Sequence, residues 1–405
     1  MTVRIEADLL IPGRGDPIEH GTVVMDNGKV AYAGPTADAP DTPDAEVTVV
    51  PVVMPGLWEC HAHFIGLAEP NLEKLVTEPT ARLAARAVGD LHRTLMGGVT
   101  SAREMGGIGL DIQPAIAAGQ VSGPSVYGAG KILSTTGGHA DIHGVPLDAL
   151  HTIDYIGELC DGVPEVTRAV RLQLRRNARV IKICASGGVM SEIDHPIHQQ
   201  FSHEELVAIV EEAARAERYV GAHCHGLPGI MAALNAGVQT IEHGSYLDEE
   251  AADIMIEQGA ILVPTRFVID ILLQEEATLP RYAYEKAQMV ADHHANALKI
   301  AVAKDVKIAM GTDIFISGDL YGQNSFEIKL LQDAGMTALE AIEAATANGP
   351  DTLGPQAPLS GQLRDGYDAD VIAINFNPLV DNAGWGDPNR VTHVWQSGNS
   401  VKAPV

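Results

Sequence analysis

Residues 54–64 read MPGLWECHAHF and contain an H-x-H motif, formed by His61 and His63. Residues 49–57 are largely apolar and β-branched, which favours a buried strand. Because alternate side chains of a strand share a face, His61 and His63 point the same way. Two imidazoles at a strand end can bind one metal ion, but an isolated pair can also be two unrelated histidines near a turn. The rest of the chain decides between these interpretations.

From residue 52 to residue 349, predicted strands alternate with predicted helices. Eight strand–helix pairs over about 300 residues favour an α/β fold of the (β/α)8 or TIM barrel type. A doubly wound open sheet is the alternative, but it would normally carry a glycine-rich phosphate turn after its first strand, and none is present. Short strands at both chain ends are expected to pair. We therefore expect a small β-sandwich domain of residues 1–52 and 357–405, and a barrel domain of residues 53–356.

Polar residues occur near the ends of the later strands in an ordered series. They are His223 and His225 in GAHCHG, His243 in IEHG, and Asp313 in MGTD. Barrel enzymes place their chemistry at the C-terminal ends of their strands. Four strand ends that deliver histidines and an aspartate to one mouth, with His61 and His63 among them, favour the metal-binding interpretation.

Lys182 lies inside the apolar strand expected at residues 180–184. A buried lysine costs several kcal/mol unless it is paired or neutral. One interpretation is a salt bridge to a barrel carboxylate such as Glu242. The other is reaction of the amine with carbon dioxide, which gives an anionic carbamate able to bridge two metals.

The ordered series of His61-x-His63, Lys182, His223, His243 and Asp313 resembles the amidohydrolase superfamily with a binuclear metal site. The similarity covers nearly the whole chain, including ATANG at 345–349 and GYDADV at 366–371. Within the superfamily the chain is most similar to the imidazolonepropionase-related group. That group includes metal-dependent Xaa-Pro dipeptidases, carboxypeptidases for dipeptides and ochratoxinase-like amidases.

The resemblance implies two divalent metals, with zinc preferred and manganese, iron or cobalt as alternatives. It also implies a homo-oligomer. The implied ligands are His61, His63 and Asp313 for one metal, His223 and His243 for the other, and carboxylated Lys182 as the bridge between them. His225 is then left free to face the substrate.

The expected reaction is hydrolysis of an amide or peptide C–N bond by a metal-bridging hydroxide. Asp313 serves as general base and acid, and His225 helps to polarise the carbonyl. The leading substrate is an Xaa-Pro-like dipeptide or an N-acyl amino acid. An alternative is an ochratoxinase-like hydrolysis of a xenobiotic amide, carbamate or phenylurea. A mononuclear deaminase, which Lys182 disfavours, and a non-catalytic scaffold are weaker alternatives.

Three further residues are candidates for substrate binding. His139, in a long loop, resembles a substrate-facing histidine of the group, or is a solvated loop residue. Tyr246 could donate to a substrate carboxylate, or pack within its loop. Arg266 could clamp a carboxylate bidentately, or pair with Asp270 or Glu275.

Composition limits the partners. The formal net charge of -26 argues against nucleic acid and anionic membranes as partners, although it does not argue for any particular ligand. The resemblance implies a small-molecule or dipeptide substrate. The N-terminal residues lack a signal-peptide layout, so a cytoplasmic location is expected. The four cysteines have no metal-knuckle or disulfide spacing. Strand alternation places Cys60 and Cys224 on the opposite face from their neighbouring histidines, and we interpret these two as small buried side chains.

Overall fold

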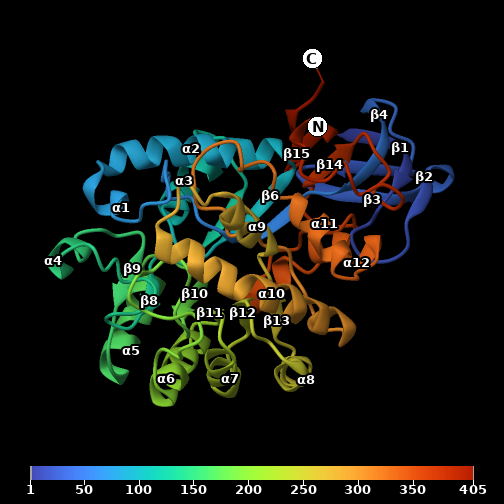
Figure 1. Ribbon diagram of the computed structural model, residues 1–405. Helices are drawn as coiled ribbons and strands as arrows, with labels where there is room; N and C mark the ends of the chain where they lie inside the picture. The colour runs from blue at the N-terminus through green and yellow to red at the C-terminus, as the bar shows by residue number, and fades with distance from the viewer. Residues whose placement is uncertain (1, 405) are drawn as a thin grey trace.

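The structure is a computed structural model that describes residues 2–404 and has an α/β fold. Parallel strands lie at the centre with helices around them, and a sheet from both chain ends lies to one side (Figure 1). The helices are α1 (Lys74–Thr77), α2 (Thr80–Met96), α3 (Gly109–Ala117), α4 (Leu147–Leu150), α5 (Val163–Arg175), α6 (His203–Ala214), α7 (Leu227–Asn235), α8 (Glu249–Gln258), α9 (Arg266–Gln274), α10 (Arg281–Ala303), α11 (Phe326–Asp333) and α12 (Ala338–Ala344).

The terminal sheet is mixed and joins the two chain ends. Its strands, in spatial order, are β16 (Asn399–Lys402), β15 (Val391–Gln396), β14 (Val371–Ile374), β4 (Glu46–Pro55), β1 (Val3–Leu10), β2 (Ile18–Asp26) and β3 (Lys29–Pro35). The antiparallel pairing of β4 with β14 confirms that the ends pair. Strand pairing gives one seven-stranded sheet where a two-sheet sandwich was expected. Val30 of β3, the last strand of this sheet, exchanges backbone hydrogen bonds with residues 366 and 367. The sheet is therefore curved, so that β3 lies against the segment that precedes β14. Apolar side chains from both ends therefore share one core.

The central strands form two parallel sheets. One contains β5 (Leu57–Ala62), β6 (Val99–Glu104) and β7 (Ser125–Gly128). The other contains, in spatial order, β13 (Ile261–Val263), β12 (Thr240–His243), β11 (Tyr219–Cys224), β10 (Val180–Cys184), β8 (Ile132–Ser134) and β9 (Gly157–Leu159).

The predicted barrel is present in part, because the strand ladder is interrupted at two places. Between β7 and β10, the N–H of Arg179 donates to the carbonyl of Gly128 at 2.9 Å. Between β13 and β5, residues 306–311 occupy the place of the eighth strand and are irregular, yet they exchange backbone hydrogen bonds with both neighbours. The two parallel sheets still share an interior, since Arg103 of β6 reaches Glu242 of β12 at 2.8 Å.

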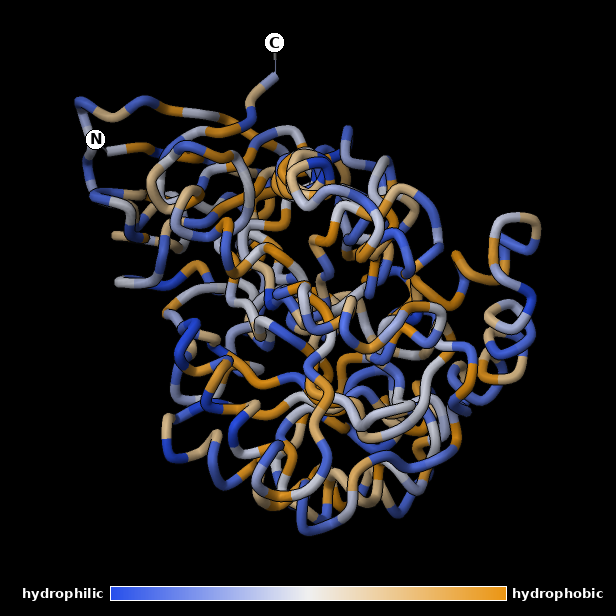
Figure 2. Tube along the Cα trace, turned by 90° about the vertical axis from the view of Figure 1, so that its left-hand side faces the viewer, coloured by the Kyte–Doolittle hydropathy of each residue, from blue (hydrophilic) through white to orange (hydrophobic). Residues whose placement is uncertain are grey.

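Helix formation follows the apolar spacing of the sequence. In α2, Leu83, Ala87, Leu91 and Leu95 recur every fourth residue and are buried. The capping box of Ser202 and Glu205 begins α6. Figure 2 shows hydrophobic stretches concentrated inside the body and hydrophilic residues along its outer loops. All four cysteines are buried and free, which confirms the burial predicted for Cys60 and Cys224.

Candidate active site

His61 and His63 lie at and just beyond the C-terminal end of β5, with 1% and 9% of their surface exposed. Nδ1 of His61 donates to Oε2 of Glu242 at 2.9 Å, and Nδ1 of His63 donates to the carbonyl of Gly106 at 2.7 Å. A neutral imidazole carries one N–H, so each Nε2 keeps a lone pair. Burial, followed by the charge of Lys182, lowers the pKa of His61 to about 4.

The carboxylate of Asp313 lies beside these two rings. Its Oδ1 is 3.1 Å from Nε2 of His63 and 3.6 Å from Nε2 of His61, and one donor atom from each residue lies within 4.8 Å of the others. Asp313 has a left-handed φ of 57°, and its N–H donates to the carbonyl of His61 at 2.9 Å. Burial raises the pKa of Asp313, but the neighbouring His61, His63 and Lys182 outweigh this effect and leave that pKa lowered. Asp313 is therefore ionised at neutral pH.

The remaining site histidines come from β11, β12 and the residues after them. The ring centroid of His223 lies 4.7 Å from that of His225 and 4.6 Å from that of His243. His243 in turn lies 4.9 Å from His61. Nε2 of His223 donates to the carbonyl of Gly187 at 3.1 Å, which leaves its Nδ1 with the lone pair. Burial lowers the pKa of all three rings well below the usual range.

The donor set fits divalent metal ions. Metal-binding histidines usually present one ring nitrogen to the metal and bind a carboxylate or carbonyl through the other. His61, His63 and His223 each have this arrangement, with one nitrogen fixed by an oxygen acceptor and a lone pair on the other. Neutral imidazoles together with the Asp313 carboxylate are ligands that zinc and similar metals prefer.

Lys182 lies in β10 with 2% of its surface exposed, and its Nζ is 3.4 Å from Nε2 of His61. Among residues 2–404, no carboxylate oxygen lies within 4.0 Å of this amine, so the salt bridge to Glu242 is not formed. Glu242 instead binds Arg103 and His61. Burial lowers the pKa of Lys182. A neutral amine is the form that reacts with carbon dioxide.

A cavity opens beside the histidines. It is lined on its polar side by His139, His223, His225, His243 and Asp313. Its other side is apolar and consists of Val189, Met190, Val268, Ile269, Leu272 and Phe315. Of the predicted substrate residues, His139 and His225 thus line this cavity.

Tyr246 and Arg266 do not line the cavity. The Tyr246 ring stacks on His293, with centroids 4.3 Å apart. Arg266 pairs with Asp270 at 2.6 Å, and its Nη1 donates to a carbonyl of α10 at 3.3 Å. The contacts of Tyr246 agree with the packing alternative given for it in the sequence analysis, and those of Arg266 agree with the alternative of pairing with Asp270.

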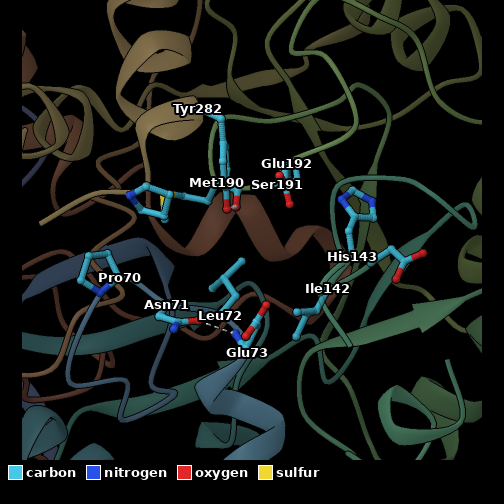
Figure 3. Close-up of a pocket in the computed structure, with 13 residues that line it drawn as sticks. Pro70, Asn71, Leu72, Glu73, Ile142, His143, Met190, Ser191, Glu192 and Tyr282 are labelled. Carbon is cyan, nitrogen blue, oxygen red and sulfur yellow. Dashed lines mark hydrogen bonds between the residues drawn. The ribbon is translucent and has the colours of Figure 1, made fainter. Parts of the chain in front are cut away.

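A second hollow lies on the outer side of residues 190–192. Figure 3 shows its walls, with Met190, Ser191, Glu192 and Tyr282 facing the segments that carry Glu73 and His143. Met190 lines both this hollow and the cavity beside the histidines. The two spaces therefore adjoin at one flexible apolar side chain.

Three supporting residues were not predicted as part of the site. Glu59 accepts hydrogen bonds from the N–H and hydroxyl of Thr312, at 2.9 and 2.6 Å, and so fixes the segment before Asp313. Arg103 and Glu242 pair inside the fold with no exposed surface. Strand alternation places Glu59 on the same face as His61, so the sequence alone could have indicated that Glu59 lies near the site. The Arg103–Glu242 pair has no local signal, because its members are 139 residues apart.

Within residues 2–404, no helix has both the length and the apolar character needed to span a bilayer.

The comparisons with known proteins identify the class. The sequence profile of the amidohydrolase family matches residues 52–401. The chain therefore belongs to the amidohydrolase family, and it is a metal-dependent enzyme that hydrolyses C–N bonds. It is 45% identical to the ochratoxinase of Aspergillus niger over 99% of this chain and 86% of that protein.

Solved structures agree with this assignment. The crystal structure of A. niger ochratoxinase superposes with a TM-score of 0.93 at 43% identity, covering 100% of this chain and 96% of that one. A prolidase solved with N-methylphosphonate-L-proline superposes with a TM-score of 0.91 at 33% identity, covering both chains fully. The sequence-based resemblance to this group is confirmed.

Proposed function

We propose that this protein hydrolyses an amide C–N bond in an ochratoxinase-like reaction, on a compound with a bulky apolar group beside that bond. The observation that carries the proposal is the apolar wall of the cavity, which faces the histidines directly. The 45% identity to ochratoxinase supports the same choice. This identity favours a xenobiotic amide as the substrate, which was the alternative in the sequence analysis, over the dipeptide, which was the leading prediction there.

His61, His63 and Asp313 would hold one divalent metal, and His223 and His243 the other. Lys182 would join them as a carbamate, formed when its neutral amine attacks carbon dioxide and releases a proton. When bound, such metals acidify a water molecule and polarise a carbonyl. Zinc remains the preferred ion for this ligand set, with manganese, iron or cobalt as alternatives.

The protein's own groups divide the remaining work. The ionised Asp313 accepts the proton of the attacking water and returns it to the leaving nitrogen as the C–N bond breaks. Nδ1 of His225 lies 2.7 Å from the Ser245 hydroxyl oxygen. In the tautomer in which Nδ1 accepts from this hydroxyl, the Nε2–H of His225 donates to the carbonyl oxygen of the substrate. The apolar wall binds the organic group and excludes water, while Met190 lets a long group extend toward the outer hollow.

The test is a hydrolysis screen with metal-reconstituted protein. We expect an ochratoxin and N-acyl amino acids with aromatic acyl groups to be cleaved with a higher kcat/KM than Xaa-Pro dipeptides. Metal analysis of protein purified without chelator should approach two equivalents per chain. Cleavage of dipeptides alone would overturn the choice of substrate, and full activity with one equivalent would overturn the binuclear site.

Xaa-Pro dipeptide hydrolysis is the second candidate, because the prolidase structure superposes over both full chains at 33% identity. The same screen separates the two. The homo-oligomer, the cytoplasmic location and the division into two domains at residues 52 and 357 stay predictions, although β4 extends past that boundary to Pro55.

A further inference from the structure

We propose that Ser191 and Asp194 fix the ring of His139 so that its Nε2 lone pair accepts a hydrogen bond from a substrate N–H. The inference rests on the proposed amide hydrolysis and narrows its substrate class. The scissile bond would belong to a secondary amide, whose nitrogen carries a hydrogen. The peptide bond before proline lacks that hydrogen.

The direction of the hydrogen bonds begins at Asp194. Its Oδ2 accepts from the N–H of Gly188 at 3.0 Å and from the side-chain amide of Gln200 at 3.3 Å. Its Oδ1 accepts from the Ser191 hydroxyl and lies 3.5 Å from Nζ of Lys286. Every one of these partners is a donor, so Asp194 acts as an acceptor only.

The bond from Ser191 to Asp194 determines which atom donates in the hydrogen bond between Ser191 and His139. The single hydroxyl hydrogen of Ser191 is used in the bond to Asp194, so its Oγ must accept from its other partner. That partner is Nδ1 of His139, at 2.8 Å. The hydrogen of the neutral imidazole therefore sits on Nδ1, and Nε2 has the lone pair. Nε2 makes no hydrogen bond to residues 2–404, while the ring lines the cavity.

The ring is also held sterically. It stacks on His223 with centroids 4.1 Å apart and an interplanar angle of 24°. On Gly188, a Cβ atom would lie 2.1 Å from Nδ1 and Cε1 of His139, so only glycine leaves room for the ring. Lys286, 8% exposed, donates to the carbonyls of Ser191 and Asp194 at 2.6 Å and fixes the loop.

An acceptor at this place selects its substrate. His139 adjoins His223, so the lone pair lies next to the groups proposed to act on the scissile bond. A secondary amide offers its N–H to Nε2, whereas a tertiary amide leaves the lone pair without a partner. Neutral hydrogen bonds contribute about 1 kcal/mol, which corresponds to a discrimination of roughly fivefold to tenfold.

The test uses metal-loaded enzyme and two substrates that differ by one methyl group, an N-acyl-alanine and the N-acyl-N-methylalanine with the same acyl group. We expect wild type to favour the N–H substrate by roughly fivefold to tenfold in kcat/KM. Ser191→Ala should bring the ratio of the two substrates toward one, and Ser191→Thr, which keeps the hydroxyl, should retain it. Gly188→Ala, which displaces the ring, should act like Ser191→Ala.

Two comparisons make the test decisive. Metal content is measured for each variant, so that a lost metal is not mistaken for a lost hydrogen bond. Binding of an N-arylsulfonyl-alanine and its N-methyl analogue, which resist hydrolysis, is measured by calorimetry on the same proteins. An equal substrate ratio in wild type and Ser191→Ala, with equal binding of the two sulfonamides, overturns the inference. If no amide is cleaved but the N–H sulfonamide binds more tightly in a Ser191-dependent way, the proposed function fails and the inference stands.

Discussion

The Glu242 carboxylate accepts the Nδ1–H of His61 at 2.9 Å, in a part of the fold where neither side chain has more than 1% exposure. Both Glu242 oxygens also lie 2.8 Å from Nη2 of Arg103. Burial alone would raise the pKa of Glu242, but Arg103 and His61 keep it far below the usual range. A permanent carboxylate thus orients a proposed metal ligand.

Glu242→Gln should lower the affinity for the first metal by roughly 10-fold to 100-fold, because partners of this kind orient the ligand and raise its basicity. The variant also leaves the buried Arg103 cation without its counter-charge, so the thermal unfolding temperature should fall. Metal titration against a competing chelator measures the affinity. The exposed Glu257→Gln is the matched control, and equal affinities in all three proteins would contradict the prediction.

Lys182→Ala should lose activity and about half of its bound metal, because the bridging anion is gone. Added short carboxylic acids should restore part of both, since they can occupy the place of the carbamate. Wild type equilibrated with ¹³C-bicarbonate should show a carbamate signal by NMR that the variant lacks, and Lys299→Ala, at the exposed surface, should keep it. A fully active Lys182→Ala enzyme would exclude a bridging role.

Most of the site could be anticipated from the sequence, because its members follow local rules. Strand alternation places His61 with His63, and the C-terminal ends of parallel strands gather His223, His243 and Asp313. The irregular segment at 306–311 and the single terminal sheet were not predictable, because they depend on pairing between distant strands. Their hydrogen bonds are visible only in the fold.

The contacts of Arg266 show where sequence reasoning was limited. A cation at a strand end is compatible both with a substrate carboxylate and with a protein partner. Asp270 lies one helical turn away on α9 and pairs with it at 2.6 Å. Tyr246 is similar, since its partner His293 belongs to α10, far along the chain.

Asp313→Asn should lower kcat by roughly 10²-fold to 10⁴-fold with a smaller change in KM, because proton transfer contributes about that much. The amide also weakens the first metal site, so the comparison needs variant protein shown to retain its metals. Single-turnover kinetics with the best amide from the screen separates chemistry from product release. A metal-loaded variant with wild-type kcat would make Asp313 a ligand only.

Arg266→Met should leave the preference between free and amidated C-termini of the substrate unchanged, because the guanidinium is already paired with Asp270. Stability should fall by at most about 1 kcal/mol, as is typical of partly exposed ion pairs between neighbouring helical turns. Lys329→Met, which removes the comparable pair with Asp333, is the control. If Arg266→Met loses a preference for a free carboxylate that wild type and Lys329→Met both show, the hypothesis that Arg266 binds a substrate carboxylate would be supported after all.

His294 offers a test of pH-dependent stability away from the proposed ligands. It is 1% exposed on α10, its Nε2 donates to the carbonyl of Pro264 at 2.7 Å, and its buried Nδ1 has no hydrogen-bond partner among residues 2–404. Burial lowers the pKa of His294 to about 4. In the unfolded chain the ring titrates near pH 6.5.

Between these two pKa values, His294 is protonated in the unfolded chain and neutral in the folded protein. The free energy of unfolding therefore falls as the pH is lowered from about 6.5 toward 4. His294→Gln keeps a side-chain donor for Pro264 and removes the titration. From pH 7 to pH 5, wild type should therefore lose about 2 kcal/mol more than the variant. Urea unfolding at several pH values, with equal metal loading, measures the free energy of unfolding of both proteins. The contributions of the other titrating groups cancel in the difference between the two proteins. Parallel stability curves for the two proteins would show that the folded protein accepts the proton at His294.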